Sequence, residues 1–466
     1  MSSDSSHDTI AAIATAEGPA GVAVVRISGP EAWQVAERVV RAGPPRLTER
    51  SAGHFFRARF ADPANGGILD DGVVLLFRAP ASFTGEDVVE IQGHGGQVLS
   101  RAVLRAVLAA GARLAAPGEF TRRAFLCGRM DLTQAEAVMD LVQARSQRAA
   151  QAARAQLAGG LGRTIGVCYD QVTGLCADVA GQLDFEAGEL PARVRGEAEA
   201  RLDAVRDDVA RLLATSREGQ LLRAGALVVI GGCPNAGKSS LLNALLGTER
   251  AIVSPTAGTT RDTIEEGLVL DGIPLRLMDT AGLREATSAV EQEGVERAHH
   301  ALGQADLVIY LLDAARPLAE QNPVFAWGAT QILLVMNKTD LPMLVDGAEV
   351  ERVFKAAGAR IASTPLKLSL KTGAGLPELK AALVEHLGVE RQAPVHASVS
   401  ERHRAELLRA DQALARGREL LSGDDSQLVL AANELRQAAE ALGRVIGRTY
   451  DADLLDQIFA RFCVGK

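Results

Sequence analysis

Hydrophobic and polar positions follow different periods in different parts of the chain. Short apolar runs bounded by Gly, Pro and Asp predict β-strands over 21–29, 72–77 and 87–93. The third run is followed by an apolar-periodic stretch over 97–111 that predicts a helix ending at Gly111. These elements indicate an α+β domain over residues 1–120.

The pattern changes to a helical period after Pro117. Between Pro117 and Pro234 the only proline is Pro191, strong helix formers dominate, and apolar residues recur three and four positions apart. A second proline-free stretch follows Val395 and has the same character. We therefore expect helices over 121–222, broken near 158–162 and 186–192, and amphipathic helices over 404–421 and 427–447.

Residues 223–388 separate these helical stretches and show a third pattern. Apolar runs alternate with helical stretches, which predicts an α/β domain with a mainly parallel sheet. We interpret this domain as an insertion into a helical domain whose halves are 121–222 and 389–466, and four consecutive domains are the alternative. The predicted strands are 226–231, 275–280, 306–314, 332–338 and 365–370.

Composition narrows the class of protein. The 466 residues are 47% hydrophobic and 23% charged, which is ordinary for a globular protein. The net charge of −8 provides no global basic field for nucleic acid, although a local basic surface remains open. The five cysteines lack Cys-x-x-Cys spacing, which fits a reducing compartment. Neither a signal peptide nor an 18-residue apolar run is recognisable, so we expect a cytoplasmic protein without a membrane span.

A phosphate-binding motif occupies 232–239. Gly232-x-x-x-x-Gly237-Lys238-Ser239 follows a predicted strand and opens a predicted helix, which is the context of a P-loop. Lys238 would reach the β- and γ-phosphates, and the Ser239 hydroxyl would ligate Mg²⁺. The predicted GTP contacts in this loop are Asn235, Ala236, Gly237, Lys238, Ser239 and Ser240.

The motif "NKTD" (337–340) indicates which nucleotide base the site binds. Asp340 can accept hydrogen bonds from guanine N1–H and from its 2-amino group, a donor pair that adenine lacks. Asn337 and the Lys338 stem would pack around the ring. The segment Ser369, Leu370 and Lys371 could supply a backbone N–H to guanine O6. The two motifs together favour GTP.

Two segments between these motifs are typical of GTPase switches. In "SPTAGTTRD" (254–262), Thr260 is the predicted switch threonine that meets Mg²⁺ and the γ-phosphate. In "DTAG" (279–282), Asp279 would hold the metal through a water. The next residue is Leu283, which cannot orient a water as the Gln of small GTPases does. The remaining predicted GTP contacts are Ser254, Pro255, Thr256, Ala257, Gly258, Thr259, Thr280, Ala281 and Gly282.

Several motifs together resemble one family over nearly the whole chain. "PNAGKSSLLN", "AGTTRD", "DTAGLRE" and the terminal "FCVGK", with "FTGEDVVEIQGHGG" and "APGEFTRRAFLCGRMDLTQAEAVMDL", are similar to the MnmE (TrmE) family of bacterial tRNA modification GTPases. The resemblance implies an N-terminal tetrahydrofolate-binding-like domain, a discontinuous helical domain and an inserted Ras-like P-loop G domain. It also implies a homodimer through the N-terminal domains.

The same resemblance implies a reaction and a partner. Family members act with the flavoprotein MnmG, which we expect to form a heterotetramer with this chain. Together they install an aminomethyl or carboxymethylaminomethyl group at C5 of the tRNA wobble uridine. The one-carbon unit would come from a tetrahydrofolate derivative, and GTP hydrolysis is coupled to the reaction.

The resemblance supplies an alternative to the missing Gln. The family uses K⁺ beside the β- and γ-phosphates, where the cation, held in a cage of oxygen atoms, neutralises charge in the transition state. The family's catalytic glutamate, which acts through water, falls on Glu291. On the residues alone, an exposed acid at a helix start is the ordinary interpretation, and Glu293 is an equally acidic neighbour. The matching K⁺ ligands are Asn235, Ser254, Thr256 and Thr259.

The family's folate contacts also map onto this chain. Family members often have Lys at the position of Arg129, and the Arg frequent after their first strand is absent from 17–21. On the residues alone, Arg129 would be a surface residue, and Arg26 and Glu90 would form a buried ion pair. The expected ligand is 5-formyl- or methylene-tetrahydrofolate. Its predicted contacts are Arg26, Glu90, Arg129 and Lys466.

Two further residues have open interpretations. Cys463 is either a functional thiol or an inert cysteine in a terminal tail. His94 is either an active-site residue or a structural residue of a turn.

The primary hypothesis is a K⁺-stimulated GTPase that serves wobble-uridine modification. A stand-alone GTPase switch in ribosome assembly would share the G domain and need neither the folate site nor the terminal Cys. A nonhydrolysing GTP-dependent scaffold is the second rival, suggested by Leu283 alone.

Overall fold

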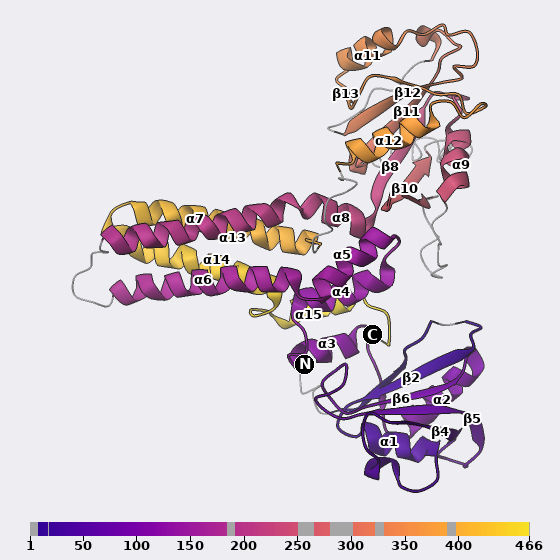
Figure 1. Ribbon diagram of the computed structural model, residues 1–466, viewed down its shortest axis with the longest axis vertical. Helices are drawn as coiled ribbons and strands as arrows, with labels where there is room; N and C mark the ends of the chain where they lie inside the picture. The colour runs from indigo at the N-terminus through magenta and orange to yellow at the C-terminus, as the bar shows by residue number, and fades with distance from the viewer. Residues whose placement is uncertain are drawn as a thin grey trace, which may run out of the picture. The chain divides into compact units, whose positions relative to one another are not determined.

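The computed structural model describes residues 8–16, 18–183, 192–249, 265–279, 302–321, 330–388 and 398–465 (Figure 1). These form two compact units, one of Met1–Met139, Leu157–Arg206 and Arg409–Lys466 and the other of Asp140–Gln156 and Asp207–Leu408. The predicted site residues that lie outside the described ranges are Ser254, Pro255, Thr256, Ala257, Gly258, Thr259, Thr260, Thr280, Ala281, Gly282, Glu291 and Lys466.

A seven-stranded sheet with the order β3-β4-β5-β6-β2-β1-β7 forms the N-terminal part of the first unit. Neighbouring strands are antiparallel except β1 and β7. One face packs on two helices, where Trp33, Ile27 and Val107 are buried together. The elements are β1 Ile10–Ile13, β2 Val22–Ser28, α1 Ala32–Val39, β3 Val40–Arg41, η1 Leu47–Glu49, β4 Phe55–Ala61, β5 Ile68–Phe77, β6 Val88–His94, α2 Gln97–Ala109 and β7 Arg113–Leu114.

The sheet confirms the strands predicted over 21–29, 72–77 and 87–93, which are β2, β5 and β6. The predicted helix over 97–111 is α2, which ends at Ala109 with Ala110 as its C-cap, and Gly111, the next residue, has a φ of 116°. A left-handed or otherwise positive φ after the last helical turn is typical of glycine.

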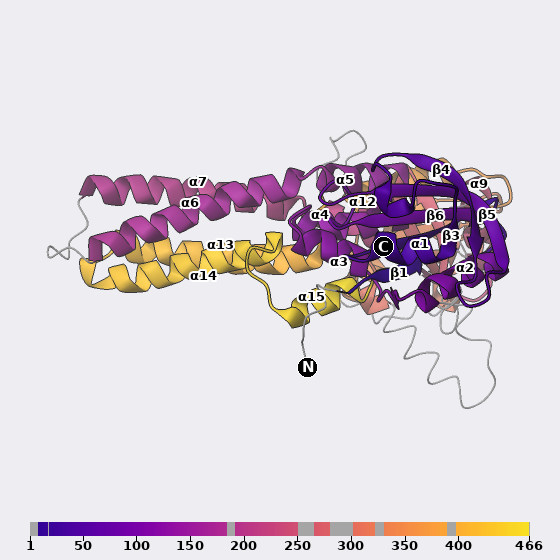
Figure 2. The same ribbon diagram turned by 90° about the horizontal axis from the view of Figure 1, so that it is seen from below.

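Long helices form the rest of the first unit. Figures 1 and 2 show α6, α7, α13 and α14 side by side. Arg418 Nε donates to Asp203 Oδ1 at 2.7 Å, and Arg206 Nε donates to Asp411 Oδ1 at 3.2 Å, so ion pairs join α7 to α13. The helices are α3 Glu119–Leu126, α4 Leu132–Gln143, α5 Gln147–Leu157, α6 Gly160–Leu183, α7 Ala192–Ala214, α13 Glu401–Ser422, η3 Asp425–Gln427, α14 Leu428–Ile446 and α15 Ala452–Phe459. Of these, most of α5 and parts of α4, α7 and α13 belong to the second unit.

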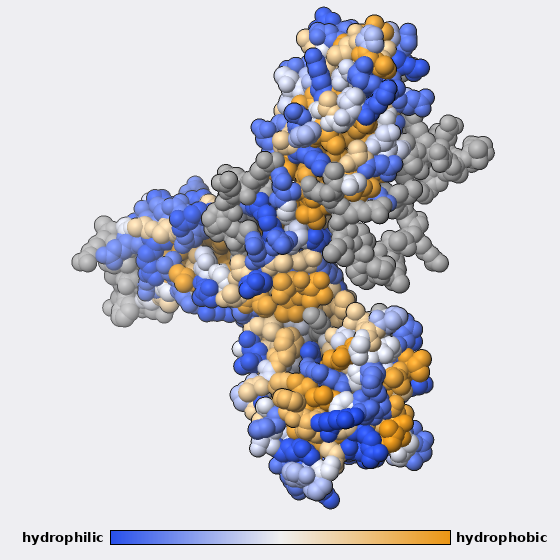
Figure 3. All heavy atoms as spheres, turned by 45° about the vertical axis from the view of Figure 1, so that its right-hand side comes forward, coloured by the Kyte–Doolittle hydropathy of each residue, from blue (hydrophilic) through white to orange (hydrophobic). Residues whose placement is uncertain are grey.

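The helical predictions agree with these bounds. The break near 158–162 falls between α5 and α6, and the helices over 404–421 and 427–447 are α13 and α14. The predicted break near 186–192 lies outside the described ranges except for residue 192. Among the helices described, none combines the length and the apolar character needed to cross a bilayer. Figure 3 shows both hydrophilic and hydrophobic residues on the drawn face of the protein.

A second sheet, with the order β13-β12-β11-β8-β10-β9 and with β14 beside β12, lies in the second unit. All pairings are parallel except that of β9 with β10, which confirms the mainly parallel sheet. All seven residues of β11 are buried, as expected for a strand covered on both faces. The elements are α8 Ser216–Ala224, β8 Ala226–Gly232, α9 Lys238–Glu249, β9 Glu265–Leu270, β10 Ile273–Asp279, β11 Leu307–Asp313, η2 Leu318–Glu320, β12 Gln331–Asn337, α11 Gly347–Ala356, β13 Arg360–Ile361, β14 Leu366–Lys367 and α12 Leu376–His386.

The last predicted strand is shorter than expected. Of residues 365–370, only Leu366–Lys367 pair with β12, so the prediction was wrong for the remainder. The chain leaves the sheet because its polar groups bond to the loop after β12. Leu368 O accepts from Thr339 Oγ1 at 3.0 Å, and Ser369 Oγ donates to Asp340 Oδ1 at 2.7 Å. This turn brings 369–371 to the base-recognition motif.

Candidate nucleotide-binding site

The loop between β8 and α9 has the backbone of a phosphate cradle. Gly232 and Gly237 have φ values of 139° and 105°, which favour glycine over residues with a Cβ. A Cβ at Gly232 would stand 2.3 Å from Leu311 O on the neighbouring strand. The loop therefore turns sharply and delivers the chain to the start of α9 at Lys238, where the N-terminal end of the helix favours an anion.

Lys238 folds back over this loop. Its side chain is buried, and Nζ donates to Gly232 O at 3.0 Å and to Cys233 O at 2.9 Å. A phosphate oxygen is a stronger acceptor than a backbone carbonyl because it is charged. The geometry thus holds an ammonium ready for the phosphates that the loop encloses.

Ser239 and Asp279 provide oxygens suited to Mg²⁺. Ser239 Oγ donates to Asp279 Oδ2 at 3.0 Å. Asp279 is the last residue of β10, which pairs in parallel with β8 and so ends beside the P-loop. Hydroxyl, carboxylate and phosphate oxygens are the ligands that Mg²⁺ prefers, so the donor set fits the ion.

Asn337 ties the base motif to the phosphate loop. Its Nδ2 donates to Ala236 O at 2.8 Å, and its Oδ1 accepts from Leu370 N at 3.2 Å. One side chain therefore connects three segments that are distant in sequence: the P-loop, the loop after β12 and the turn at 369–371. The structure thus brings together the described part of the predicted GTP contacts.

Asp340 is held in place for base recognition. Ser369 Oγ donates to its Oδ1 at 2.7 Å, and this hydrogen bond holds the pKa of Asp340 below its ordinary value. The carboxylate is therefore ionised at neutral pH and can accept from guanine. The Asp340 side chain is exposed, as a ligand-facing acid requires.

Substituting Gly237 by alanine is expected to weaken GDP binding by about tenfold or more, because a strained backbone costs about 1–3 kcal/mol. A Cβ there would stand 2.5 Å from Asn337 Nδ2, the group that bonds to Ala236 O. Titration with a fluorescent GDP analogue measures the effect. The control is Gly247→Ala in α9, where a Cβ meets nothing within 4 Å. Equal affinities of Gly237→Ala and the wild type would contradict the assignment.

Sequence reasoning missed Asp313. It is the last residue of β11, and its Oδ2 accepts from Lys338 Nζ at 2.6 Å. The signal was an acid directly at the end of a buried strand predicted over 306–314. Because β11 and β12 are parallel neighbours, such an acid ends beside the start of the base motif.

The N-terminal sheet brings two of the predicted folate contacts together. Arg26 and Glu90 are opposite each other on β2 and β6, and Arg26 Nε donates to Glu90 Oε1 at 2.9 Å. The ion pair expected from the residues alone is therefore present, but it is half-buried rather than buried. The Arg26 guanidinium also lies 5.6 Å and 5.7 Å from the ring centroids of Phe83 and Phe120. The Arg129 stem lies beside Gly85, where a Cβ would stand 3.2 Å from Arg129 Cγ.

The C-terminal segment packs on the same sheet. Gly118 N donates to Cys463 O at 3.4 Å, and a Cβ at Gly465 would stand 2.2 Å from Ile13 O at the end of β1. Ala12, the neighbour of Ile13, is the register partner of Arg26. The segment with Cys463 is therefore packed against this domain rather than a free tail, and the thiol residue is exposed.

His94 forms an ordinary ion pair at the end of β6. Its Nδ1 lies 2.7 Å from Asp70 Oδ1, and this hydrogen bond raises the pKa of His94. The same Asp70 carboxylate accepts from His94 N at 2.8 Å. This arrangement favours the structural interpretation of His94.

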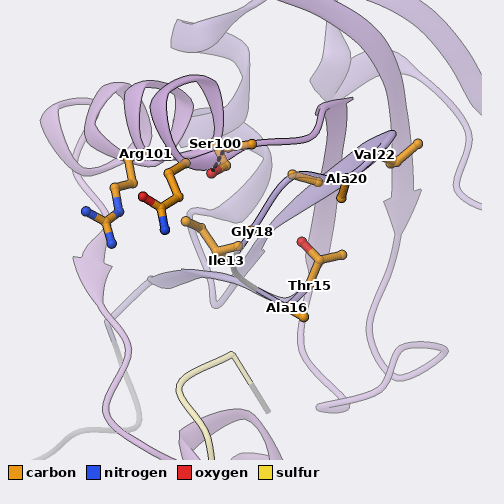
Figure 4. Close-up of a pocket in the computed structure, with 11 residues that line it drawn as sticks. Ile13, Thr15, Ala16, Gly18, Ala20, Val22, Ser100 and Arg101 are labelled. Atoms are coloured by element: carbon orange, nitrogen blue, oxygen red, sulfur yellow. Dashed lines mark hydrogen bonds between the residues drawn. The ribbon is translucent and has the colours of Figure 1, made fainter. Parts of the chain in front are cut away.

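A hollow separates the end of β1 from the start of α2. Figure 4 shows Thr15 and Arg101 at its edges, and Ser100 Oγ donates to Gly96 O at 2.8 Å beside it. Neither Arg26 nor Glu90 lines this hollow. It is therefore separate from the predicted folate contacts.

The second unit thus has a parallel sheet, a P-loop and an Asn-Lys-Thr-Asp motif bonded to that loop, which together define the class of P-loop GTP-binding proteins. Two family models match the chain: "MnmE helical domain" over residues 132–463 and "GTP-binding protein TrmE N-terminus" over residues 9–129. The chain belongs to the MnmE family of tRNA modification GTPases.

Curated relatives match along the entire chain. The tRNA modification GTPase MnmE of Bordetella petrii is 42% identical over 470 residues, with 99% of each chain covered. That of Symbiobacterium thermophilum is 43% identical over 465 residues, covering 99% of this chain and 100% of the relative. That of Geobacillus thermodenitrificans is 42% identical over 471 residues, covering 98% and 99%.

Proposed function

We propose that this chain is a K⁺-stimulated GTP hydrolase that, with the flavoprotein MnmG, adds an aminomethyl or carboxymethylaminomethyl group at C5 of the tRNA wobble uridine. One observation carries the proposal: relatives named tRNA modification GTPase match 99% of the chain, N-terminal and helical parts included. A stand-alone GTPase switch requires only the G domain, so full-length similarity argues against that rival. The G domain described here supports the nucleotide part of the proposal.

The proposal divides the chemistry among named residues. The Lys238 ammonium and the P-loop N–H groups bind the phosphates, and a bound Mg²⁺ would supply positive charge between them. Ser239 and Thr260 would ligate Mg²⁺, and Asp279 would hold it through a water. Glu291 acts as the catalytic acid through water, which leaves Leu283 without a chemical role. The proposed K⁺ ligands are Asn235, Ser254, Thr256 and Thr259.

GTP turnover is expected to be at least about tenfold faster in KCl than in NaCl of equal ionic strength, because a cation beside the leaving phosphate stabilises transition-state charge. Asn235, exposed in the P-loop, is the described member of the proposed K⁺ set. Asn235→Ala should therefore remove the difference between the salts at saturating GTP. Phosphate release at saturating GTP is the measurement. Equal turnover of the wild-type protein in both salts would rule out the potassium role.

The N-terminal domain is proposed to bind the tetrahydrofolate derivative, which supplies the one-carbon unit. Arg26 and Glu90 offer a charged pair beside the Phe83 and Phe120 rings, a combination suited to a flat ring with polar edges. Arg129 and Lys466 complete the proposed set. We also propose dimerisation through this domain, a cytoplasmic location, and domain boundaries at 1–120, 121–222, 223–388 and 389–466.

Reconstitution tests the whole proposal. The purified chain, MnmG, methylenetetrahydrofolate, an ammonium source and an unmodified tRNA are combined, and wobble nucleosides are analysed by mass spectrometry. We expect aminomethyluridine only when GTP and K⁺ are both present. Product that forms equally well without GTP would contradict the coupling of the two activities.

A further inference from the structure

A buried carboxylate lies behind the base-recognition motif. Asp313 is buried, and its Oδ2 accepts from Lys338 Nζ at 2.6 Å. Lys338 has a φ of 66°. This left-handed conformation is energetically unfavourable for a residue that has a Cβ. The ion pair therefore fixes a side chain whose backbone is itself held in a strained conformation. In the proposed GTP site, the Lys338 stem would face the flat surface of the base.

Gln321 clamps the backbone of Asp313. Gln321 Oε1 accepts from Asp313 N at 2.9 Å, and its Nε2 donates to Asp313 O at 2.8 Å and to Arg316 O at 2.9 Å. The Gln321 side chain is buried, so these bonds are shielded from water. The amide thus satisfies both backbone groups of Asp313 where β11 ends, and it sets the position from which the carboxylate reaches Lys338.

The same glutamine contacts the phosphate loop. Cys233 Sγ donates to Gln321 O at 2.7 Å, and Cys233 O accepts from Lys238 Nζ at 2.9 Å. Burial raises the pKa of the Cys233 thiol, so the thiol is protonated at neutral pH and is able to donate. A continuous series of contacts therefore joins the phosphate-binding lysine to the base-binding lysine.

We propose that Asp313, held by Gln321, is a positioning residue for guanine-nucleotide binding, which fixes the Lys338 stem as the platform for the base. The inference rests on the proposed GTP site and adds two residues to it. Asp313 acts through Lys338 and touches no edge of the base. Its contribution is consequently the same for every purine nucleotide, whereas Asp340 distinguishes purines by their edges.

Asp313→Asn keeps the shape of the side chain and removes the charge. We expect GDP and IDP to bind about tenfold more weakly, as for the loss of a buried charge partner. The ratio of the two affinities should stay within about twofold of the wild-type ratio, because the platform does not read the 2-amino group. The matched control is Glu320→Gln, an exposed acid seven positions away, which should bind both nucleotides as the wild type does.

A double-mutant cycle separates positioning from a general structural role. If Asp313 acts through Lys338, the double variant Asp313→Asn/Lys338→Met should bind GDP no more weakly than Lys338→Met alone. Additive losses would overturn the proposal. Gln321→Glu removes the two hydrogen bonds that Gln321 Nε2 donates and keeps the size of the side chain. It should weaken the binding of GDP and of IDP by the same factor, and a changed ratio of the two affinities would contradict the proposal. This variant also serves if Asp313→Asn does not fold.

The outcomes distinguish this inference from the proposed function. A wild-type protein that does not bind GDP would remove the nucleotide site itself. A wild-type protein that binds GDP, together with an Asp313→Asn variant of equal affinity, would remove only the positioning role. Thermal unfolding of each variant verifies that the affinities compare folded proteins.

Discussion

Replacing Lys238 by alanine is expected to lower GTP turnover by about 10³-fold, the effect of removing a preorganised charge from a transition state. The side chain is buried over the P-loop, and Nζ bonds to two carbonyls of that loop. These carbonyls lie on a loop whose shape is set by Gly232 and Gly237, so the alanine variant should fold normally. Steady-state phosphate release measures the loss.

The matched control for this variant is Lys355→Ala. Lys355 lies exposed on α11, where its Nζ pairs with Glu351 Oε1 at 2.6 Å. Such an exposed pair contributes about 0–1 kcal/mol, so this variant should hydrolyse GTP at the wild-type rate. A Lys238→Ala enzyme that retains even a tenth of wild-type turnover would contradict the phosphate role of Lys238.

Asp340→Asn is expected to change the base preference of the nucleotide site from guanine to xanthine. Asp340 accepts from two donors of guanine, and an asparagine amide instead offers one donor and one acceptor, which match the C2 carbonyl and N1–H of xanthine. Because one guanine donor then faces an amide N–H, GDP affinity should fall about 10³-fold, while XDP affinity rises. Competition of GDP and XDP against a fluorescent nucleotide gives both values.

Two variants define the limits of this prediction. Asp346→Asn, at the exposed start of α11 without a side-chain capping bond, should leave the base preference unchanged. Ser369→Ala removes the hydrogen bond to Asp340 Oδ1. This variant should bind GDP more weakly and should not bind XDP more tightly. If Asp340→Asn still prefers GDP to XDP, another group reads the base.

Much of the G domain could be predicted from sequence because its signals are local. A fully buried strand followed by glycines and a helix start specifies β8, the P-loop and α9, and each step depends on residues adjacent in sequence. The base motif follows β12 for the same reason. The P-loop and the base motif accordingly lie at the ends of β8 and β12, as the sequence predicted.

Features that depend on long-range contacts could not be predicted in this way. β3, β7, β13 and β14 have two residues each, so their sequences carry no alternation to detect. The bond between Gln321 and Asp313 spans eight residues and carries no motif. The packing of the Cys463 segment on Gly118 joins residues more than 300 positions apart, and only the fold brings them together.

The most direct test of the central claim is the state of the wobble uridine in cells. A strain lacking the gene is complemented with the wild-type chain, with Lys238→Ala or with Lys355→Ala, and nucleosides from total tRNA are analysed by mass spectrometry. We expect aminomethyl or carboxymethylaminomethyl uridines in the wild-type and Lys355→Ala strains and their loss in the deletion and Lys238→Ala strains. Unchanged wobble nucleosides in the deletion strain would contradict the account.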